Sequence, residues 1–203
     1  MTNYTHPVVL EGDRVRLELL SINHLEALCQ VGLDPVLWEK APAPLQSEKD
    51  MRKYIHTALE WHVLGTALPF VIIDKPSAAV IGSTRYANID QSNRRLEIGW
   101  TWVGKAWQRT HVNTEAKFLL LRHAFEQLGC IRVEFKTDSL NSQSRSALIR
   151  IGAKEEGTLR NHMIVHDGRY RHSVYFSIIE PEWPDVKQRL SSLLARTQRP
   201  HGV

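Results

Sequence analysis

The chain has 203 residues, 42% hydrophobic and 24% charged, a composition typical of a globular protein with a substantial core. No apolar run approaches the roughly 20 residues of a membrane-spanning helix, and the N-terminal segment lacks the pattern of a secretory signal. The net charge of +4 fits an acidic substrate, a phosphate-bearing cofactor or a nucleoprotein partner. Because Lys and Arg are spread along the chain, it does not indicate a nucleic-acid-binding tail.

The first half of the chain predicts one strand, two helices and a pair of strands. Residues 8–20 contain the first strand, since apolar and charged side chains alternate there. Ser21 precedes a helical stretch, and Ser47 begins a second helix that continues to Leu64. The segments "LPFVIID" and "AAVIGSTRYA" are joined by the short polar "KPS", which predicts a hairpin.

The second half predicts a strand, a helix and a second strand in succession. "RRLEIGWTWV" is the first strand, a polar loop leads into a helix from about Thr114 to Leu128, and "IRVEFKT" is the second strand. "NSQSRSALIRIGA" predicts a short helix, and "NHMIVHDGRYRHSVYFSII", which begins at Asn161, ends the core as a hairpin around Asp167 and Gly168. By alternation, the inward face of the first strand carries Leu96, Ile98, Trp100 and Trp102, and the other face carries Glu97, Gly99, Thr101 and Val103.

This order of elements predicts the fold class. A strand–helix–strand crossover over residues 96–137, flanked by hairpins, indicates an α/β (α+β) fold whose mixed sheet is mostly antiparallel with one parallel pair. No Pro/Gly/Ser-rich break divides the chain. We therefore expect a single domain over residues 1–203, with a core of about 8–180 and a tail of about 181–203.

The sequence predicts no metal site. His162 and His166 are four residues apart, but their segment reads as a strand, which places them roughly 13 Å apart. Cys29 and Cys130 show no metal-ligand spacing, and two unpaired cysteines fit a reducing, cytoplasmic location.

The polar run "QRTHVNT", residues 108–114, stands where the central helix begins. The first N–H groups of a helix have no partner within it, and they carry the positive end of its dipole. Such a start suits a pyrophosphate, although an ordinary capped helix after a polar loop would look the same. The run matches neither of the common glycine-rich nucleotide-binding loops.

Three segments resemble the GNAT superfamily of acetyl-CoA-dependent N-acetyltransferases, and within it the branch that acetylates ribosomal-protein alanine and serine termini. They are "LEIGWTWV", "WQRTHVNTEAKFLLLRHAFEQLG" and "IRVEFKTDSLNSQSRSALIRIGAKEEG". Their order and spacing carry the resemblance, which extends over nearly the whole chain. It implies the GNAT fold, in which two parallel strands separate and hold acetyl-CoA between them. Here these strands would be 96–103 and 131–137.

The resemblance also implies a set of cofactor-binding residues. The family loop has the pattern [Gln/Arg]-x-x-Gly-x-[Gly/Ala]; Gln108 matches its first position, but His111 and Asn113 stand where the family has glycine. Asn tolerates a positive φ better than most residues, and His111 can instead donate to a phosphate. The residues implied to bind the cofactor are Trp102, Val103, Gln108, Arg109, Thr110, His111, Val112, Asn113, Thr114, Asn141 and Arg145.

Two residues are implied to be catalytic. Glu97 would be the general base, acting directly or through water, unless it only forms a cross-strand ion pair. Ser144 would protonate the departing thiolate, unless it is a solvated helix residue. The N–H near Trp102, beyond a bulge that Gly99 permits, would polarise the acetyl carbonyl. Asn141 would bind the pantetheine arm or cap the helix that follows it.

Together these features predict an N-acetyltransferase that moves the acetyl group of acetyl-CoA to a primary amine by direct attack in a ternary complex. The acceptor would be a protein N-terminus or a small molecule. The alternative is a non-catalytic protein of the same fold that binds CoA or a partner, which the missing loop glycines favour. We expect no membrane or nucleic-acid partner, and a monomer or homodimer.

Overall fold

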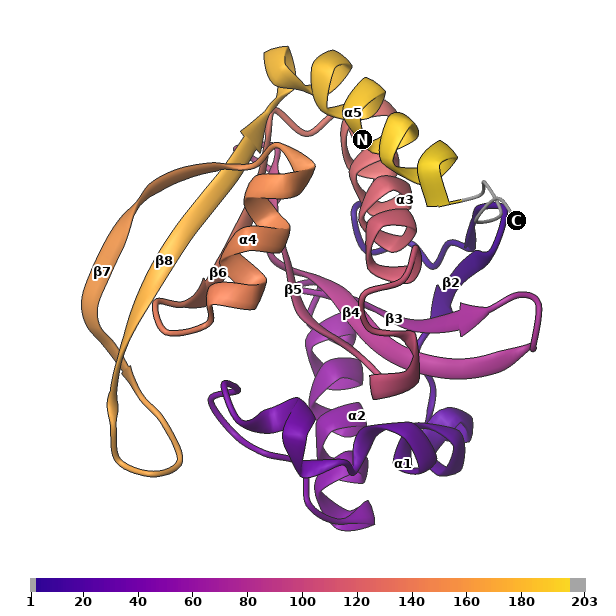
Figure 1. The fold of residues 1–203 in the computed structure, drawn as a ribbon, viewed down its shortest axis with the longest axis vertical. Helices are drawn as coiled ribbons and strands as arrows, with labels where there is room; N and C mark the ends of the chain where they lie inside the picture. The colour runs from indigo at the N-terminus through magenta and orange to yellow at the C-terminus, as the bar shows by residue number, and fades with distance from the viewer. Residues whose placement is uncertain (1–2, 198–203) are drawn as a thin grey trace, which may run out of the picture.

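The computed structural model describes residues 3–197, which form an eight-stranded sheet in the order β1-β2-β3-β4-β5-β6-β8-β7 (Figure 1). The strands are β1 (Leu10–Glu11), β2 (Val15–Leu19), β3 (Leu68–Asp74), β4 (Ala79–Asp90), β5 (Arg95–Val103), β6 (Arg132–Asp138), β7 (Lys154–Ile164) and β8 (Tyr170–Ile179). Neighbouring strands pair antiparallel except β5 and β6, which are parallel. The predicted fold class is confirmed.

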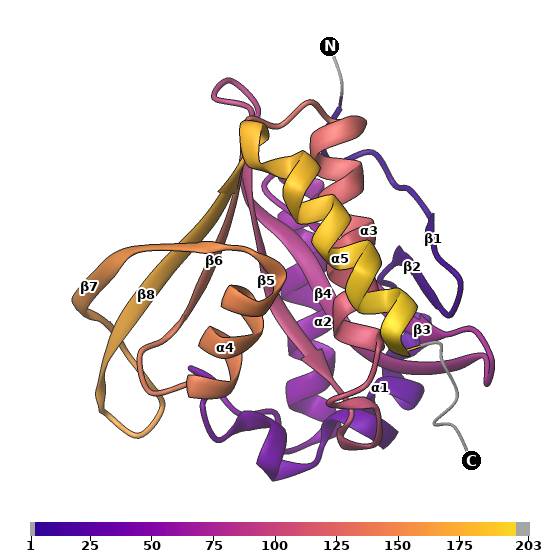
Figure 2. The ribbon, with the colours of Figure 1, turned by 45° about the horizontal axis from the view of Figure 1, so that its top comes forward.

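Helices cover both faces of this sheet (Figures 1 and 2). The α-helices of the described chain are α1 (Leu25–Gly32), α2 (Glu48–Val63), α3 (Val112–Glu126), α4 (Ser142–Ile151) and α5 (Trp183–Thr197). Short 3₁₀ helices are η1 (Ile22–His24), η2 (Pro35–Trp38), η3 (Lys105–Trp107) and η4 (Glu180–Glu182). One apolar cluster joins α3, α4 and α5 to the sheet, and a second joins α1 and α2 to its other face. The sheet therefore has an α3 face and an α2 face.

The predicted helix boundaries have clear local causes. The side chain of Ser47 accepts a hydrogen bond from the Asp50 N–H, and α2 begins at the next residue. Gly152, with φ of 102°, ends α4 in a left-handed conformation that glycine adopts without strain. The predicted β3–β4 hairpin and the β7–β8 hairpin are confirmed.

Three boundaries differ from the prediction. The expected strand over residues 8–20 is two strands, β1 and β2, which pair with each other around a turn. Helix α3 begins at Val112, two residues earlier than expected. Strand β7 begins at Lys154 rather than near Asn161. All of its residues are exposed, so its sequence lacks the alternation of apolar and polar residues that a buried face would produce.

The described part of the predicted tail is a helix. Its α5 packs along α3, where Trp183 stacks on Phe125 with ring centroids 5.4 Å apart, and Leu190 is fully buried. The expected loose end of the tail, residues 198–203, lies outside the described residues.

Candidate active site

Strands β5 and β6 pair only over their first three residues. The last pair in register is Glu97 with Glu134, whereas β5 continues to Val103 and β6 to Asp138. Beyond that pair the two strands diverge, as Figures 1 and 2 show. Strand β6 keeps its partner β8 along its whole length, and β5 keeps β4. The later part of β5 therefore has a backbone edge without a strand partner on the β6 side.

A bulge interrupts β5 just past this point. Ser83 pairs with Trp102 and Arg85 pairs with Gly99, so β5 has one more residue than β4 between these two pairs. Trp100 lies at the bulge with φ of 50°, in the left-handed region. The predicted bulge is confirmed, although Trp100 rather than Gly99 adopts the unusual conformation.

The bulge makes the predicted faces of β5 wrong after Gly99. Leu96 and Ile98 lie in the core beneath α3, as expected, but Trp102 packs on the α2 face against Trp38, with ring centroids 5.5 Å apart. Val103 lies on the α3 face instead. The extra residue reverses the alternation, since successive side chains of a strand point to opposite faces.

Glu97 is buried on the α2 face, with 3% of its surface exposed. Its Oε2 accepts a hydrogen bond from Asn88 Nδ2 at 2.7 Å and lies 3.4 Å from Lys136 Nζ. Because Asn88 is on β4 and Lys136 on β6, the carboxylate is held from both neighbouring strands. Glu97 is the last β5 residue that pairs with β6, so its carboxylate lies where the two strands begin to diverge.

A cluster of aromatic rings and one cation packs beside the bulge on the α2 face. The Arg85 guanidinium carbon lies 4.8, 5.3 and 5.2 Å from the ring centroids of Tyr54, Trp61 and Trp100. Arg85 is 1% exposed, and its Nε and Nη2 have no hydrogen-bond partner. The Tyr54 hydroxyl donates to the Trp100 carbonyl oxygen at 3.3 Å. Helix α2 thus fixes the position of the bulge.

The loop before α3 has its left-handed residue at an unexpected position. Arg109 has φ of 59°, whereas His111 has φ of −65° and Asn113 lies within α3. His111 and Asn113, which stand where the family has glycine, therefore do not adopt a positive φ. The positive φ considered for Asn113 is wrong. Thr110 Oγ1 donates to the Trp107 carbonyl oxygen at 2.7 Å and accepts from the Val112 N–H at 3.3 Å, which ends the loop and starts the helix.

The other predicted loop residues have separate roles in this structure. Exposed Gln108 donates from Nε2 to the Val103 carbonyl oxygen at 3.3 Å, and the Val112 side chain is fully buried. Asn113 and Thr114 lie in the first turn of α3, whose N–H groups have no partner within the helix.

The structure adds a residue that the sequence did not indicate, Arg150. Its Nη2 donates to Thr114 Oγ1 at 3.0 Å, which places a cation from the end of α4 beside the first turn of α3. In the sequence Arg150 looks like the other dispersed arginines. Only the packing of α4 beside α3 shows that it lies at the start of α3.

The predicted residues of α4 form two contacts. The Asn141 side chain accepts from the Ser144 N–H at 2.9 Å, so Asn141 is the N-cap of α4, as one of its two interpretations predicted. Arg145 Nη2 donates to Glu155 Oε2 at 3.1 Å. Ser144 is half-buried in the first turn of α4.

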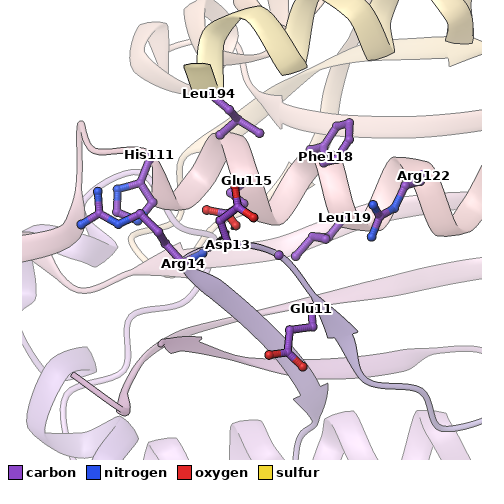
Figure 3. Close-up of a pocket in the computed structure, with 10 residues that line it drawn as sticks. Glu11, Asp13, Arg14, His111, Glu115, Phe118, Leu119, Arg122 and Leu194 are labelled. Carbon is purple, nitrogen blue, oxygen red and sulfur yellow. Dashed lines mark hydrogen bonds between the residues drawn. The ribbon is translucent and has the colours of Figure 1, made fainter. Parts of the chain in front are cut away.

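His111 lies in a pocket between α3, the β1–β2 turn and α5 (Figure 3). Its Nε2 is buried without a partner, and burial lowers its pKa, with a smaller contribution from Arg14. In the same pocket, Glu115 Oε1 accepts from the Arg14 N–H at 2.9 Å. The ring of His111 therefore faces this pocket, while its backbone belongs to the α3 start.

The turn between β7 and β8 lies near the loop after η2. The His166 N–H donates to the Pro42 carbonyl oxygen at 3.1 Å, and Val165 is buried. His162 lies 3.0 Å from Ser173 Oγ. Within residues 3–197 no group of three or more His, Cys, Asp or Glu side chains is arranged to hold a metal ion. None of the described helices is both long and apolar enough to cross a membrane.

Residues 14–154 match the family model of the acetyltransferase (GNAT) domain. The chain is 28% identical over 175 residues to an uncharacterised N-acetyltransferase, p20, of Bacillus licheniformis, a match covering 86% of this chain and 97% of p20. It is 35% identical over 109 residues to YdaF of Bacillus subtilis (strain 168), provisionally named a ribosomal N-acetyltransferase. That match covers 54% of this chain and 58% of YdaF.

Solved structures agree in fold. A GCN5-related N-acetyltransferase from Brucella melitensis is 31% identical with a TM-score of 0.87, covering 96% of this chain and 88% of that one. RimJ of Mycobacterium smegmatis, solved in complex with CoA-disulfide, is 23% identical with a TM-score of 0.76, and 92% of each chain is covered. From the family match, the parallel strands that diverge and the bulge in β5, this chain belongs to the GNAT acetyltransferase family.

Proposed function

We propose that this protein transfers the acetyl group of acetyl-CoA to a primary amine, by direct attack of the amine in a ternary complex. The observation that carries the proposal is the separation of β5 from β6 immediately after Glu97. It leaves a carboxylate, an unpaired strand edge and a helix N-terminus in one region of the fold. In this proposal the described chain acts as one domain.

The residues present fit acetyl-CoA in two ways. The unpaired edge of β5 offers backbone N–H and C=O groups to the amides of a pantetheine arm, as a partner strand would. The first turn of α3, with Arg150 beside it, offers N–H groups and a positive charge to the phosphates. Gln108, Arg109 and Thr110 precede this turn, Asn141 caps α4 and Arg145 lies on it. These residues stay our predicted cofactor contacts.

Each protein group would then have a defined task. Glu97 accepts the proton of the amine, directly or through one water, because an ammonium has no lone pair with which to attack. A backbone N–H of β5 near Trp102, past the bulge, donates to the acetyl carbonyl as negative charge develops on it. Ser144 stays the donor that the sequence predicts for the departing sulfur.

The acceptor would approach from the α2 face. That face carries Glu97 and the aromatic cluster around Arg85, and it is bordered by the bonded segments at Pro42 and His166. Relatives such as YdaF carry names that refer to ribosomal proteins. Protein N-termini are therefore the first acceptors to test. The two cysteines, which form no disulfide, fit the cytoplasmic location that we propose.

The direct test measures free CoA thiol released from acetyl-CoA in the presence of N-terminal peptides of ribosomal proteins, polyamines and other small primary amines. We expect release above the acceptor-free rate with at least one class. A protein that binds acetyl-CoA but releases no thiol with any acceptor is a non-catalytic binding protein, and the proposed transfer is then wrong.

Acetyl-CoA should stabilise the folded protein. A ligand that binds only the folded state at a concentration of about a hundred times its Kd adds roughly 2.7 kcal/mol to the free energy of unfolding. For a chain of this length each kcal/mol raises Tm by about 2–4 °C, so we expect a rise of roughly 5–11 °C. Differential scanning fluorimetry measures it. An unchanged Tm at millimolar acetyl-CoA would contradict cofactor binding.

Arg150→Ala should weaken CoA binding by about 10- to 150-fold, since hydrogen bonds to charged groups contribute roughly 1.5–3 kcal/mol. Calorimetric titration with CoA measures the loss. Arg150→Lys, which keeps the charge, should lose less. Pantetheine, which has no phosphate, should bind the wild type and Arg150→Ala equally well. An equal loss of affinity for both ligands would mean that Arg150 acts by holding α3 and α4 together.

A further inference from the structure

Lys117 is a buried amine in the middle of the fold. It lies on α3 with 6% of its surface exposed, and its Nζ donates to Thr101 Oγ1 at 2.8 Å. Thr101 Oγ1 in turn shares a hydrogen bond of 2.7 Å with Thr84 Oγ1 on β4. No carboxylate among residues 3–197 forms an ion pair with Lys117, which is unusual for a buried lysine.

Contacts of Lys117 place its Nζ where the two parallel strands diverge. Thr101 follows Trp100, the residue at the β5 bulge. The Nζ also lies 5.7 Å from the ring centroid of Phe135, and Phe135 follows Glu134, the last β6 residue that pairs with β5. Lys117 therefore contacts both strands just past their last pair.

Lys117 and Glu97 approach this region from opposite faces of the sheet. Glu97 is on the α2 face, where its carboxylate contacts Asn88 and Lys136. Lys117 reaches the strands from α3. A thioester held along the β5 edge at the bulge would lie between a carboxylate on one side and an amine on the other.

The surroundings of Lys117 let its amine hold or release a proton near neutral pH. Burial lowers its pKa to about 7. The elements packed against it present Thr101 from β5, Thr84 from β4 and Phe135 from β6, none of which titrates in this range. The cation of Arg150 lies one turn away, on Thr114. A free thiol has a pKa of about 8.5, so an ammonium of this acidity can protonate a thiolate.

We propose that Lys117 is a further catalytic residue and takes the place of Ser144 as the acid: its ammonium gives its proton to the sulfur of CoA as the acetyl group leaves. The bond between the amine nitrogen and the acetyl carbon forms, and the carbon–sulfur bond breaks with its electron pair going to sulfur. Glu97 takes one proton of the acceptor ammonium before the attack and passes it to solvent, and it takes the second proton as the amide forms. Sulfur takes the Nζ proton, and solvent returns a proton to Lys117. This inference rests on the proposed acetyl transfer.

The test compares Lys117→Met, which keeps the length of the chain without the charge, with the wild type. We expect kcat to fall by about 10²-fold at neutral pH, as for loss of a general acid. The decline in the wild-type rate on the alkaline side should disappear in the variant. Lys187→Met, which removes an exposed lysine paired with Glu126 on the surface, is the matched control and should keep the wild-type rate.

Binding gives a readout that does not depend on turnover. Calorimetry with CoA and with desulfo-CoA, which lacks the sulfur, should show that Lys117→Met loses about tenfold in affinity for CoA and none for desulfo-CoA. If Lys117→Met does not fold, as judged by circular dichroism, Lys117→Gln replaces it in the same measurements.

Three outcomes would overturn the proposal. The first is a variant that keeps both the wild-type kcat and the wild-type ratio of CoA to desulfo-CoA affinity. The second is an alkaline decline that survives in Lys117→Met but is lost in Ser144→Ala, which assigns the acid to α4. The third is acetylation of Lys117 itself, found by mass spectrometry, which makes it a nucleophile. If the wild type releases no thiol with any amine, the proposed transfer fails, whatever Lys117 does.

Discussion

Glu97→Gln should lower kcat by about 10²- to 10⁴-fold while leaving the affinity for CoA nearly unchanged. The substitution keeps the shape of the side chain and its ability to accept from Asn88, but it removes the charge that would take the proton of the amine. The loss should shrink at high pH, where the acceptor amine is already deprotonated in solution. Steady-state kinetics from neutral to alkaline pH, together with calorimetry for CoA, measure both effects.

The matched control is Glu134→Gln. Glu134 is the cross-strand partner of Glu97 in the β5–β6 pair, and it bonds to Arg95 and Arg132 rather than facing an acceptor. We expect it to keep most of the wild-type kcat. If Glu97→Gln keeps most of its activity at neutral pH, Glu97 is only the ion-pair partner of Lys136, and the base lies elsewhere on the α2 face.

Gly82→Ala should destabilise the protein by roughly 1–3 kcal/mol and remove most of its activity. A Cβ at this position would lie 2.2 Å from the Trp102 carbonyl oxygen and 3.0 Å from the Val103 Cα. These are backbone atoms of β5 just past the bulge, so they move only if the β4–β5 ladder opens there. The opening would displace the N–H that we expect to polarise the acetyl group. Urea denaturation and kcat are the two measurements.

Gly104→Ala is the control for this substitution. Its added Cβ would lie 3.2 Å from the Val31 Cβ and 3.3 Å from the Trp107 ring, so a shift of a few tenths of an ångström relieves the contact and the β4–β5 ladder stays closed. We expect its free energy of unfolding to stay within about 1 kcal/mol of the wild type. Equal stability of Gly82→Ala and the wild type would show that β5 shifts freely at this point, and the bulge would then not be rigidly placed.

Local patterns in the sequence predicted the elements that have one buried face. Residues 131–137 alternate because β6 buries Val133 and Phe135, and the Ser47 cap preceded a helical stripe in α2. The first part of strand β7, residues 154–160, gave no such signal, since the strand buries none of its residues. The two faces of β5 were wrong after Gly99 because a bulge depends on how β4 pairs with β5, which no local pattern encodes.

The candidate site was predictable only where a residue lies inside a motif. The loop before α3 was singled out by its polar run at a helix start and Glu97 through the family resemblance, and the roles of both stay predictions. Arg150 and Lys117 were not, because their positions follow from tertiary packing: α4 against α3 in one case, and α3 over the diverging strands in the other. Helix α3 is buried over most of its surface, so its sequence shows no clear polar face from which a buried Lys117 could be distinguished.

The hydrogen bond between the β7–β8 hairpin and the loop after η2 joins parts of the chain that are separate from the proposed cofactor contacts. The proposed cofactor contacts all come from one continuous stretch, residues 102–150. The proposed walls of the acceptor side come from two distant stretches, which meet where the His166 N–H donates to the Pro42 carbonyl oxygen. Substitutions that reshape this junction leave the cofactor stretch untouched. Selection on a duplicated gene can therefore alter acceptor preference in small steps while acetyl-CoA binding is inherited intact.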